Sequence, residues 1–600
     1  MTIDYNAYAN LPALYFEKAA ENGSRNFLWV KRAETYHPIT WEACTRDIKA
    51  LSLGLRQLGL ARGERVVVLS ENRPEWLISD LAIMSAGGIT VPAYTTNMTN
   101  DHLHVLSHSG AVGVIVSTRA LAQRLLPAAM QSQDCRWIIA LEEFEAGQTG
   151  ELQLFAWSDV IASGAEQPDD VEDYARAAGR DDVACFIYTS GTGGVPKAVM
   201  STHGGILANC HGAHRLLQDF GLGDEIFLSF LPLSHSYEHT AGQFFPISLS
   251  AQIYYAESVD QLLKNLAEVR PTVMTAVPRL YESMYQRLSR QLQKEKPFKQ
   301  RLFAKTEALG RKKAHEGGRL NLIESLQDAV LDRLVRNKVR ARFGGRLKAM
   351  VSGGAALNPD IGLYFTALGL RILQGYGQTE ASPVISANPP ARIKMETVGP
   401  ALDGVEVKIA GDGEILVRGE LLMKGYWQDE EATDSTIVDG WLHTGDIGEM
   451  DGDGYIKITD RKKDIIVLSG GDNVSPARVE SFLTLQTEIE QAMVIGDKRP
   501  HLVAILVPDK DFLRDWCKAN GKSHALSDLT DDADLKALLK AAVERVNEDL
   551  PPLEKVRRFM IAPEGFTTEN EMATPTLKIR RHKIKAVYGE ALEGLYGKAS

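Results

Sequence analysis

Ten consecutive residues, Tyr188-Thr-Ser-Gly-Thr-Gly-Gly-Val-Pro-Lys197, gather side chains that could bind phosphate. They follow a short apolar run, Val183 to Ile187, which predicts a buried strand. Glycine lets main-chain N–H groups approach an anion closely, and serine and threonine hydroxyls add further donors. Because Lys197 adds a positive charge at the end of the segment, the pattern predicts a loop that cradles phosphate groups.

This segment differs from the Walker phosphate loop, which ends in Gly-Lys followed by Ser or Thr. Here the end is Pro196-Lys197-Ala198, so the helix-opening glycine and the magnesium-binding hydroxyl are missing. Taken alone, such a segment is more typical of a plain turn after a strand, and three motifs further along the chain reverse this in favour of phosphate.

Three later segments again combine glycine with polar side chains. They are Ser352-Gly-Gly-Ala-Ala-Leu357, Gln374-Gly-Tyr-Gly-Gln-Thr-Glu380 and Trp441-Leu-His-Thr-Gly-Asp446, and Asp460-Arg461 follows the last. The first two come directly after apolar runs. Loops at the carboxyl ends of parallel strands are where open α/β sheets bind ligands, so these segments are candidates for the same site.

The elements that must position these segments alternate between strands and helices. Short apolar runs such as 65–70, 114–116 and 137–140 predict parallel strands, and Pro74 suits the first turn of an intervening helix. From 404 to 449 the apolar residues alternate as in antiparallel strands, and from Ile465 onward a smaller α+β region is expected. The fold class is therefore α/β, with a large N-terminal domain of mixed, largely parallel sheets.

The bulk composition excludes several classes of function. The chain has 600 residues and a formal net charge of −11, which argues against general nucleic-acid binding. Five scattered cysteines indicate reduced thiols, and neither a signal core nor an apolar run of ~18 residues is present. We expect a cytoplasmic protein that lies at most peripherally on the inner face of a membrane.

One stretch, residues 287–346, carries 17 lysines and arginines against 6 carboxylates and has a helical pattern. The simplest interpretation is a solvated helical face. The alternative is a patch that faces anionic lipid.

In their order and approximate spacing, these motifs resemble the adenylate-forming (AMP-binding) superfamily over nearly the whole chain, from about Trp41 to Lys585. The chain is most similar to the long-chain fatty acid–CoA ligases. Val277-Pro-Arg-Leu-Tyr-Glu282 followed by a helical insertion at about 285–345, and Thr574-Pro-Thr-Leu-Lys578, resemble that branch.

The resemblance implies a reaction, its cofactors and a domain organisation. ATP would convert a fatty acid to an acyl-adenylate with release of pyrophosphate, and the thiol of coenzyme A would then displace AMP, with Mg²⁺ required. Because two anions must meet, the site has to supply positive charge and oriented donors. An AMP-binding domain at 1–460, with a small β-barrel-like region, and a mobile C-terminal domain at 461–600 are expected.

The resemblance also assigns residues to the nucleotide and to magnesium. Glu380, with the Thr189 hydroxyl, would bind Mg²⁺, and Asp446 would accept from the ribose hydroxyls beside Arg461. Thr189, Ser190, Gly191 and Thr192 would hold the phosphates, and Gly353, Gly354 and Ala355 with Tyr376 would form the adenine slot. The remaining cofactor-binding residues implied are Gly194, Lys197, Gln374, Gly375, Gly377 and Thr379.

Further residues would serve catalysis and the domain movement. Lys578 would bridge the carboxylate and α-phosphate oxygens, and His235 would lie near the acyl carboxylate. Lys463 matches the hinge about which the small domain pivots, and Ser469, Gly470 and Gly471 would then line the pantetheine channel.

The sequence departs from the family pattern in two places. Gly193 and Ala198 replace a second threonine and a final glycine of the phosphate loop. Thr576-Leu577 replaces the Ser-Gly that normally precedes the catalytic lysine, which makes Lys583 a competitor for the role of Lys578.

Three other functions compete with the ligase. His235-Ser-Tyr-Glu238-His239 matches the H-x-x-E-H pattern of a zinc metalloprotease helix, in which histidines four apart share one face. An acyl-adenylate could instead be passed to a carrier protein. A binding protein that has lost its chemistry is the third, although Glu380, Asp446 and Lys578 argue against it.

Overall fold

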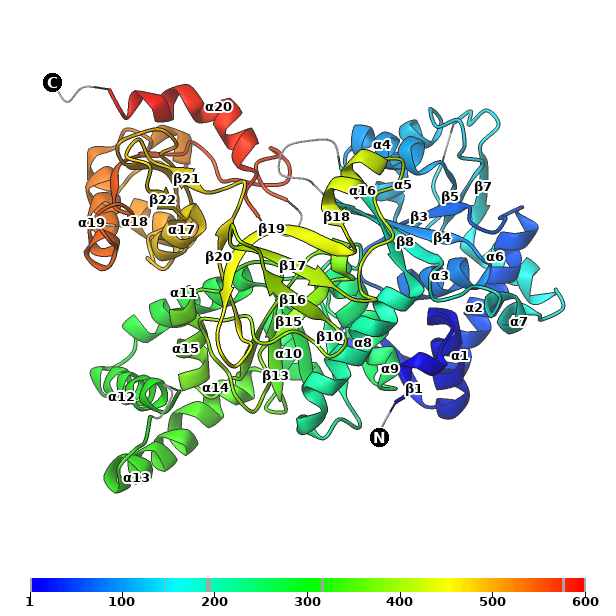
Figure 1. Cartoon of the computed structure of the whole chain (residues 1–600), viewed down its shortest axis with the longest axis horizontal. Helices are drawn as coiled ribbons and strands as arrows, with labels where there is room; N and C mark the ends of the chain where they lie inside the picture. The colour runs from blue at the N-terminus through cyan, green and yellow to red at the C-terminus, as the bar shows by residue number, and fades with distance from the viewer. Residues whose placement is uncertain (1–2, 146, 190–195, 315–317, 575–577, 598–600) are drawn as a thin grey trace.

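A computed structural model describes residues 3–145, 147–189, 196–314, 318–574 and 578–597, and Figure 1 shows the arrangement of its elements. Two large sheets, a small antiparallel sheet and a C-terminal α/β unit follow one another along the chain. The mixed, largely parallel architecture expected from the sequence is confirmed.

The first large sheet has seven strands in the order β7-β6-β5-β3-β4-β8-β9. All its pairings are parallel except that of β8 with β9. The strands are β3 Arg65–Leu69, β4 Ile89–Ala93, β5 Ala111–Val116, β6 Trp137–Ala140, β7 Gln153–Ala156, β8 Val183–Thr189 and β9 Lys197–Thr202.

The second large sheet has eight strands in the order β15-β14-β13-β12-β10-β11-β1-β2, antiparallel only at its two ends. The strands are β1 Asn26–Arg32, β2 Thr35–Thr40, β10 Ile226–Ser229, β11 Gln252–Tyr255, β12 Val273–Ala276, β13 Ala349–Ser352, β14 Ile372–Gly377 and β15 Val384–Ala387. The sequence predicts a single short strand near the N-terminus, but the chain forms the hairpin β1–β2.

Helices cover both large sheets, and one continuous core joins the sheets to α1, α3 and α8. Pro74 begins α3, as its fixed φ favours, and Gly87 follows the helix with a φ of +77°. The helices of this part are α1 Leu11–Asn22, α2 Trp41–Gln57, α3 Pro74–Ser85, α4 Thr99–Ser109, α5 Arg119–Ala129, α6 Trp157–Ala165, α7 Val171–Ala175, α8 His203–Leu217, α9 Phe245–Ser248, α10 Leu262–Val269 and α15 Pro359–Ala367.

Short helical turns complete this part of the chain. They are η1 Tyr5–Ala7, η2 Gln218–Phe220, the π-helix η3 Glu238–Phe244 and η5 Thr379–Ala381. The first residues of the predicted Gln374–Glu380 loop belong to β14, because this strand continues to Gly377 and pairs with β15.

The basic stretch forms a helical insertion between β12 and β13, and α12 and α13 project from one corner of the molecule (Figure 1). Its elements are α11 Pro278–Gln293, α12 Pro297–Ala314, α13 Leu322–Leu331, the π-helix η4 Asp332–Arg336 and α14 Asn337–Arg342. Among the described residues no helix has both the length and the apolar character needed to cross a membrane.

The small antiparallel region expected from the sequence is a five-stranded sheet. Its elements are β16 Glu406–Ile409, β17 Glu414–Arg418, α16 Glu430–Thr436, β18 Ile437–Val438, β19 Trp441–Met450 and β20 Ile456–Arg461.

The C-terminal unit has a core of its own, formed by residues between Ile466 and Leu592. Its three-stranded sheet, β23-β24-β25, combines an antiparallel and a parallel pairing. The elements are β21 Ile466–Val467, β22 Asn473–Val474, α17 Pro476–Thr484, β23 Ile489–Ile495, β24 Leu502–Pro508, α18 Lys510–Asn520, η6 Leu526–Asp528, α19 Ala533–Asp549, β25 Val556–Ile561 and α20 Arg581–Gly594.

Candidate active site

The predicted phosphate loop connects two antiparallel strands. Thr189 ends β8 and lies opposite Lys197, the first residue of β9. The intervening positions Ser190, Gly191, Thr192 and Gly194 lie outside the described residues. The hairpin brings the threonine hydroxyl and the lysine of the motif to the same end of the seven-stranded sheet.

Tyr426 connects this hairpin with Glu380. The Lys197 ammonium lies 5.0 Å from the centre of the Tyr426 ring and pairs with Asp429 at 2.9 Å. The Tyr426 hydroxyl donates to Oε1 of Glu380 at 2.8 Å, and burial raises the pKa of this phenol, which keeps it a donor. Sequence reasoning missed Tyr426, because an isolated tyrosine between Gly425 and Trp427 carries no motif.

The residues around Glu380 fit a magnesium ion. One carboxylate oxygen of Glu380 accepts from the neutral Tyr426 hydroxyl, and no donor among the described residues holds the other oxygen, which can therefore take a cation. Carboxylate and hydroxyl oxygens, together with phosphate, are the ligands that Mg²⁺ prefers.

A second set of contacts centres on Asp446, which is buried, with 3% of its surface exposed. Tyr376 donates its hydroxyl to Oδ2 of Asp446 at 2.7 Å, and Nε of Arg461 donates to Oδ1 at 3.0 Å. Asp446 and Arg461 are register partners on β19 and β20, while Tyr376 comes from β14. Three predicted residues from two sheets are thus brought together.

Lys578 reaches this group from the C-terminal unit. Its N–H donates to the Thr574 hydroxyl at 3.1 Å, and its carbonyl accepts from the Thr574 N–H at 2.8 Å. The residue keeps contact with solvent but is closely surrounded by protein. This crowding and the Arg461 charge, partly opposed by Asp446, lower the pKa of Lys578 to about 8.

The competing lysine has a different environment. Lys583 forms an ion pair with Glu571 on the surface of the C-terminal unit. The electrostatic neighbours of Lys578, in contrast, are Arg461, Asp446 and His235 of the predicted site. The geometry therefore favours Lys578.

His235 belongs to the large domain and lies near Lys578 of the C-terminal unit. Its Nδ1 accepts the N–H of Tyr237 at 3.2 Å. Burial and the Lys578 charge lower the pKa of His235 to about 4, so its imidazole is neutral near pH 7. Next to it, the Ser236 hydroxyl contacts the Thr379 hydroxyl at 3.1 Å, which ties this segment to the Glu380 turn.

The structure explains why glycine occupies two positions of the predicted adenine slot. A Cβ on Gly353 would lie 3.0 Å from the ring of Tyr237, so a larger residue would have to displace this ring. Gly354 adopts a φ of +83°, and Ala355 beyond it is exposed. The loop after β13 is therefore shaped around Tyr237, a second residue that the sequence did not reveal.

The β14 residues of the motif contact the neighbouring strand. A Cβ on Gly377 would lie 1.9 Å from the Pro383 oxygen, and one on Gly375 would lie 3.1 Å from the Ser386 oxygen. Both glycines thus permit close strand pairing. Oε1 of Gln374 is buried with no hydrogen-bond partner among the described residues, so this site retains an unused acceptor for a ligand such as an adenine amino group.

The predicted coenzyme A residues belong to the C-terminal unit. Lys463 lies in the turn after β20. Ser469, Gly470 and Gly471 form the turn between β21 and β22, where Ser469 N–H donates to the Arg499 carbonyl at 3.0 Å. In this arrangement Lys578 of the C-terminal unit is an electrostatic neighbour of Asp446.

The zinc interpretation of residues 235–239 does not fit the geometry. Nε2 of His239 bonds Asp80 at 2.8 Å in a fully buried pair, whereas His235 neighbours Lys578. Glu238 accepts from Ser229 and Thr275, both at 2.6 Å. Among the described residues no group of three or more His, Cys, Asp or Glu side chains is arranged to hold a metal ion.

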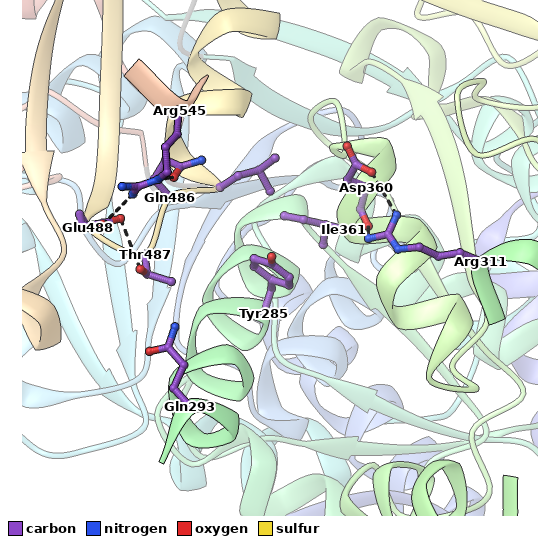
Figure 2. A pocket seen from close by; sticks show the side chains of 10 residues that line it. Tyr285, Gln293, Arg311, Asp360, Ile361, Gln486, Thr487, Glu488 and Arg545 are labelled. Atoms are coloured by element: carbon purple, nitrogen blue, oxygen red, sulfur yellow. Dashed lines mark hydrogen bonds and ion pairs between the residues drawn. The ribbon is translucent and has the colours of Figure 1, made fainter. Parts of the chain in front are cut away.

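A cavity of about 530 Å³ separates the helical insertion from the C-terminal unit and lies away from the residues above (Figure 2). Tyr285 and Gln293 of α11 line one side, and Thr487, Glu488 and Arg545 line the other. Figure 2 shows Arg545 directed toward Gln486 and Glu488, with which it bonds at 2.9 and 2.7 Å. Its polar lining indicates a solvated gap between two surfaces that touch beside it.

Fold and site together define the class of this protein. The AMP-binding enzyme family matches residues 15–427, and the C-terminal domain of AMP-binding enzymes matches residues 463–600, so the chain belongs to the AMP-binding enzyme family.

Among curated proteins the chain is similar to a long-chain-fatty-acid–CoA ligase of Mycobacterium tuberculosis, with 35% identity over 93% of this chain and 92% of the relative. It is 30% identical to a peroxisomal long chain acyl-CoA synthetase of Arabidopsis thaliana, over 94% of this chain and 82% of the relative. Among solved structures, the adenylation domain of a carboxylate reductase from Mycobacterium chelonae has a TM-score of 0.78 at 21% identity, covering 99% of this chain and 92% of that one.

Proposed function

We propose that this protein is an AMP-forming long-chain fatty acid–CoA ligase that uses ATP and Mg²⁺. Two relatives with these activities in their names cover more than nine tenths of the chain. The observation that carries the proposal is that Lys578, a cation of the C-terminal unit, interacts electrostatically with Asp446 of the large domain.

The first half-reaction joins two anions. A fatty acid carboxylate oxygen attacks the α-phosphorus of ATP, and the bond to the β-phosphate bridging oxygen breaks as pyrophosphate leaves. We assign Lys578 to neutralise the carboxylate and α-phosphate oxygens during this step, because its charge lies at the domain junction. Neutral His235 borders the same space and offers a hydrogen-bonding ring without adding another charge.

We assign the remaining residues of the large domain to binding. Asp446, held by Tyr376 and Arg461, would accept the ribose hydroxyls, and the loop after Gly353 would take the adenine. Glu380 and Thr189 would hold Mg²⁺, which lowers the repulsion between the phosphates and the incoming carboxylate. Lys197 with Ser190, Gly191, Thr192 and Gly194 completes the proposed phosphate site.

In the second half-reaction the thiolate of coenzyme A attacks the acyl carbon, and the bond to the AMP oxygen breaks. We propose that the division into 1–460 and 461–600, with a hinge at Lys463, serves this step. A rotation there would withdraw Lys578 and bring Ser469, Gly470 and Gly471 to the site.

A peripheral position on the inner face of a membrane in the cytoplasm is part of the same proposal, since long-chain acids partition into lipid. The helical insertion is the surface we assign to this contact. Several of its basic side chains are already paired, among them Arg290 with Asp509 and Arg311 with Asp360 at 3.1 Å, so excess charge alone does not create the contact.

The test is pyrophosphate release from ATP and Mg²⁺ with palmitate, with and without coenzyme A. Release that needs palmitate and increases with coenzyme A supports the ligase. Lys578→Ala should reduce release by about 100-fold, whereas Lys583→Ala should leave it unchanged.

Two other results would redirect the proposal. Release that ignores coenzyme A would favour transfer of the acyl group to a carrier protein. If no fatty acid of any length caused pyrophosphate release, the remaining interpretation would be a binding protein without catalytic activity.

A further inference from the structure

The helix formed by α13 and η4 carries three carboxylates spaced four residues apart, and all three are paired. Glu324 pairs with Lys312 of α12 at 2.7 Å, Asp328 with Arg336 at 2.7 Å, and Asp332 with Arg340 at 2.6 Å. Arg336 is buried and donates to the Ala367 carbonyl at 2.6 Å, so this row of acids faces the body of the protein.

A second row on the same helix, also spaced four residues apart, is apolar and exposed. Leu322, Leu326, Val330 and Leu334 are 92, 71, 51 and 47% exposed, and Ile323 beside them is 70% exposed. The other large apolar side chains exposed among the described residues are scattered along the sequence. An exposed apolar face of this size needs an explanation, because the same helix turns its row of carboxylates toward the body of the protein.

The exposed charge next to the apolar row is positive. Arg319, Arg333, Lys338 and Arg342 are exposed, whereas each carboxylate between 318 and 342 is paired with a lysine or arginine. Arg333 adjoins Leu334, at the edge of the apolar row. An apolar row bordered by cations matches the surface of a bilayer that contains anionic lipid.

We propose that the outward face of α13 and η4, defined by Leu322, Ile323, Leu326, Val330 and Leu334, is a docking surface for an anionic membrane. The helix lies along the bilayer, with its apolar row among the acyl chains and its arginines at the headgroups. A row from Leu322 to Leu334 is about 18 Å long, the length of a short interfacial helix.

The position of this helix at a projecting corner leaves the surface accessible to a flat bilayer (Figure 1). A second copy of the chain is a weaker candidate for the occupant. A twofold contact would place the same arginines of both copies against each other, and the carboxylates of α13 and η4 that could neutralise them are already paired. A membrane surface would serve the proposed function, because the water-insoluble fatty acid is held in the membrane. The exposure and charge of the helix support the docking surface independently of that function.

The insertion also links this surface to the site. It leaves β12 directly after Ala276, whose carbonyl accepts the N–H of Gly353 at 3.0 Å in the adenine loop. A membrane-bound insertion would therefore fix the large domain, through α11, at a defined distance from its lipid-soluble substrate.

The first experiment is co-sedimentation of the full chain with vesicles of phosphatidylcholine alone or with one quarter phosphatidylglycerol. We expect binding to the anionic vesicles that weakens with salt, and a loss of at least tenfold in Leu326→Gln/Val330→Gln. The matched control, Val259→Gln/Val587→Gln, changes two valines that are 62 and 60% exposed elsewhere and should bind like wild type.

A second measurement reports the surface directly. The five native cysteines are buried, so a cysteine introduced at an exposed position can be labelled selectively. A bimane probe on Val330→Cys should shift to the blue with anionic vesicles, while the same probe on Val259→Cys should not. Equal shifts at both positions, or none, would overturn the proposal.

Two further outcomes would also overturn it. Unchanged binding of Leu326→Gln/Val330→Gln would exclude the apolar row. A dimer in light scattering that the same variant converts to a monomer would identify the surface as an interface between copies. Ligase activity is assayed separately with palmitate in detergent, so a protein that binds vesicles without activity would contradict the proposed function and leave the docking surface intact.

Discussion

A guanidinium nitrogen of Arg279 donates to the main-chain oxygen of Glu490 at 2.7 Å and so joins α11 to the first strand of the C-terminal sheet. Further along the same helix, Gln286 donates to the Thr484 carbonyl at 3.2 Å, and Arg290 pairs with Asp509. These positions are seven and four residues apart, which places them on one face of α11. That face holds the C-terminal unit in the arrangement that brings Lys578 to Asp446.

Weakening this face of α11 should slow only the first half-reaction. Arg279→Ala and Arg290→Ala each remove a charge-assisted contact of about 1.5 kcal/mol, so we expect adenylation, measured by ATP–pyrophosphate exchange, to fall roughly tenfold. Thioester formation from supplied acyl-adenylate should be maintained. Arg287→Ala, on the exposed side of α11, is the matched control, and equal loss in both half-reactions would argue against a conformational role.

The contact between Tyr376 and Asp446 should govern ATP binding. Tyr376→Phe keeps the ring and loses one hydrogen bond, so kcat/KM for ATP should fall roughly fivefold, or about 1 kcal/mol. Asp446→Ala removes the proposed ribose acceptor and the carboxylate that pairs with Arg461, so we expect kcat/KM for ATP to fall by the equivalent of about 3 kcal/mol. Tyr455→Phe, whose hydroxyl donates to the Arg392 carbonyl at 2.8 Å, serves as the control. A Tyr376→Phe variant as impaired as Asp446→Ala would show that the phenol itself acts in catalysis.

The lowered pKa of Lys578 predicts the pH dependence of adenylation. In the role proposed for Lys578, only the protonated ammonium neutralises the reacting anions, and it is lost as the pH rises through the pKa of about 8. The exchange rate should therefore decline above pH 8, about tenfold per pH unit. Lys578→Arg stays charged throughout, so its profile, although lower, should be flat there. A wild-type profile that is flat to pH 9.5 would exclude a titrating lysine.

The buried pair of His239 and Asp80 makes a prediction about stability. Burial lowers the pKa of His239, but the Asp80 charge outweighs it and raises the pKa to about 10. Because the folded pKa exceeds the unfolded value of about 6.5, the contribution is complete below pH 6.5 and is lost as the pH rises through 10.

Asp80→Asn should destabilise the domain by about 3–5 kcal/mol near pH 7 and flatten the dependence between pH 7 and 9.5. Trp76 packs edge-on against His239 at 5.6 Å, so its fluorescence can follow urea unfolding at this place. Ser85→Ala, a buried hydroxyl later on α3, provides the comparison. If Asp80→Asn were as stable as wild type, the His239–Asp80 pair would not contribute to stability.

Local patterns predicted much of the fold. The apolar run at 183–187 became β8, Pro74 began α3, and the alternation from 404 produced the antiparallel sheet. The ends of these elements were less predictable. β8 takes in Tyr188 and Thr189, and β14 takes in Gln374 to Gly377, because pairing with β9 and β15 extends strands whose sequence is typical of loops.

The contacts of the site were beyond local patterns because they join distant segments. The bond from Tyr426 to Glu380 spans 46 residues, and that from Arg279 to Glu490 spans 211. Motif order placed Asp446 and Lys578 in one site, but no sequence signal showed that Tyr426 connects the phosphate hairpin with Glu380. Charge counting likewise highlighted the insertion and missed the apolar row, since pairing partners decide which face of α13 turns outward.

The burial of all five thiols has a consequence for an enzyme that would handle coenzyme A. Burial raises the pKa of Cys44, Cys135, Cys210 and Cys517, and Cys185 is buried as well, so none of the five presents a thiolate to solvent. Thiol–disulfide exchange needs such a thiolate to attack a sulfur. The protein should therefore remain free of mixed disulfides with the oxidised form of its own substrate, and its activity should not follow the redox state of the coenzyme A pool.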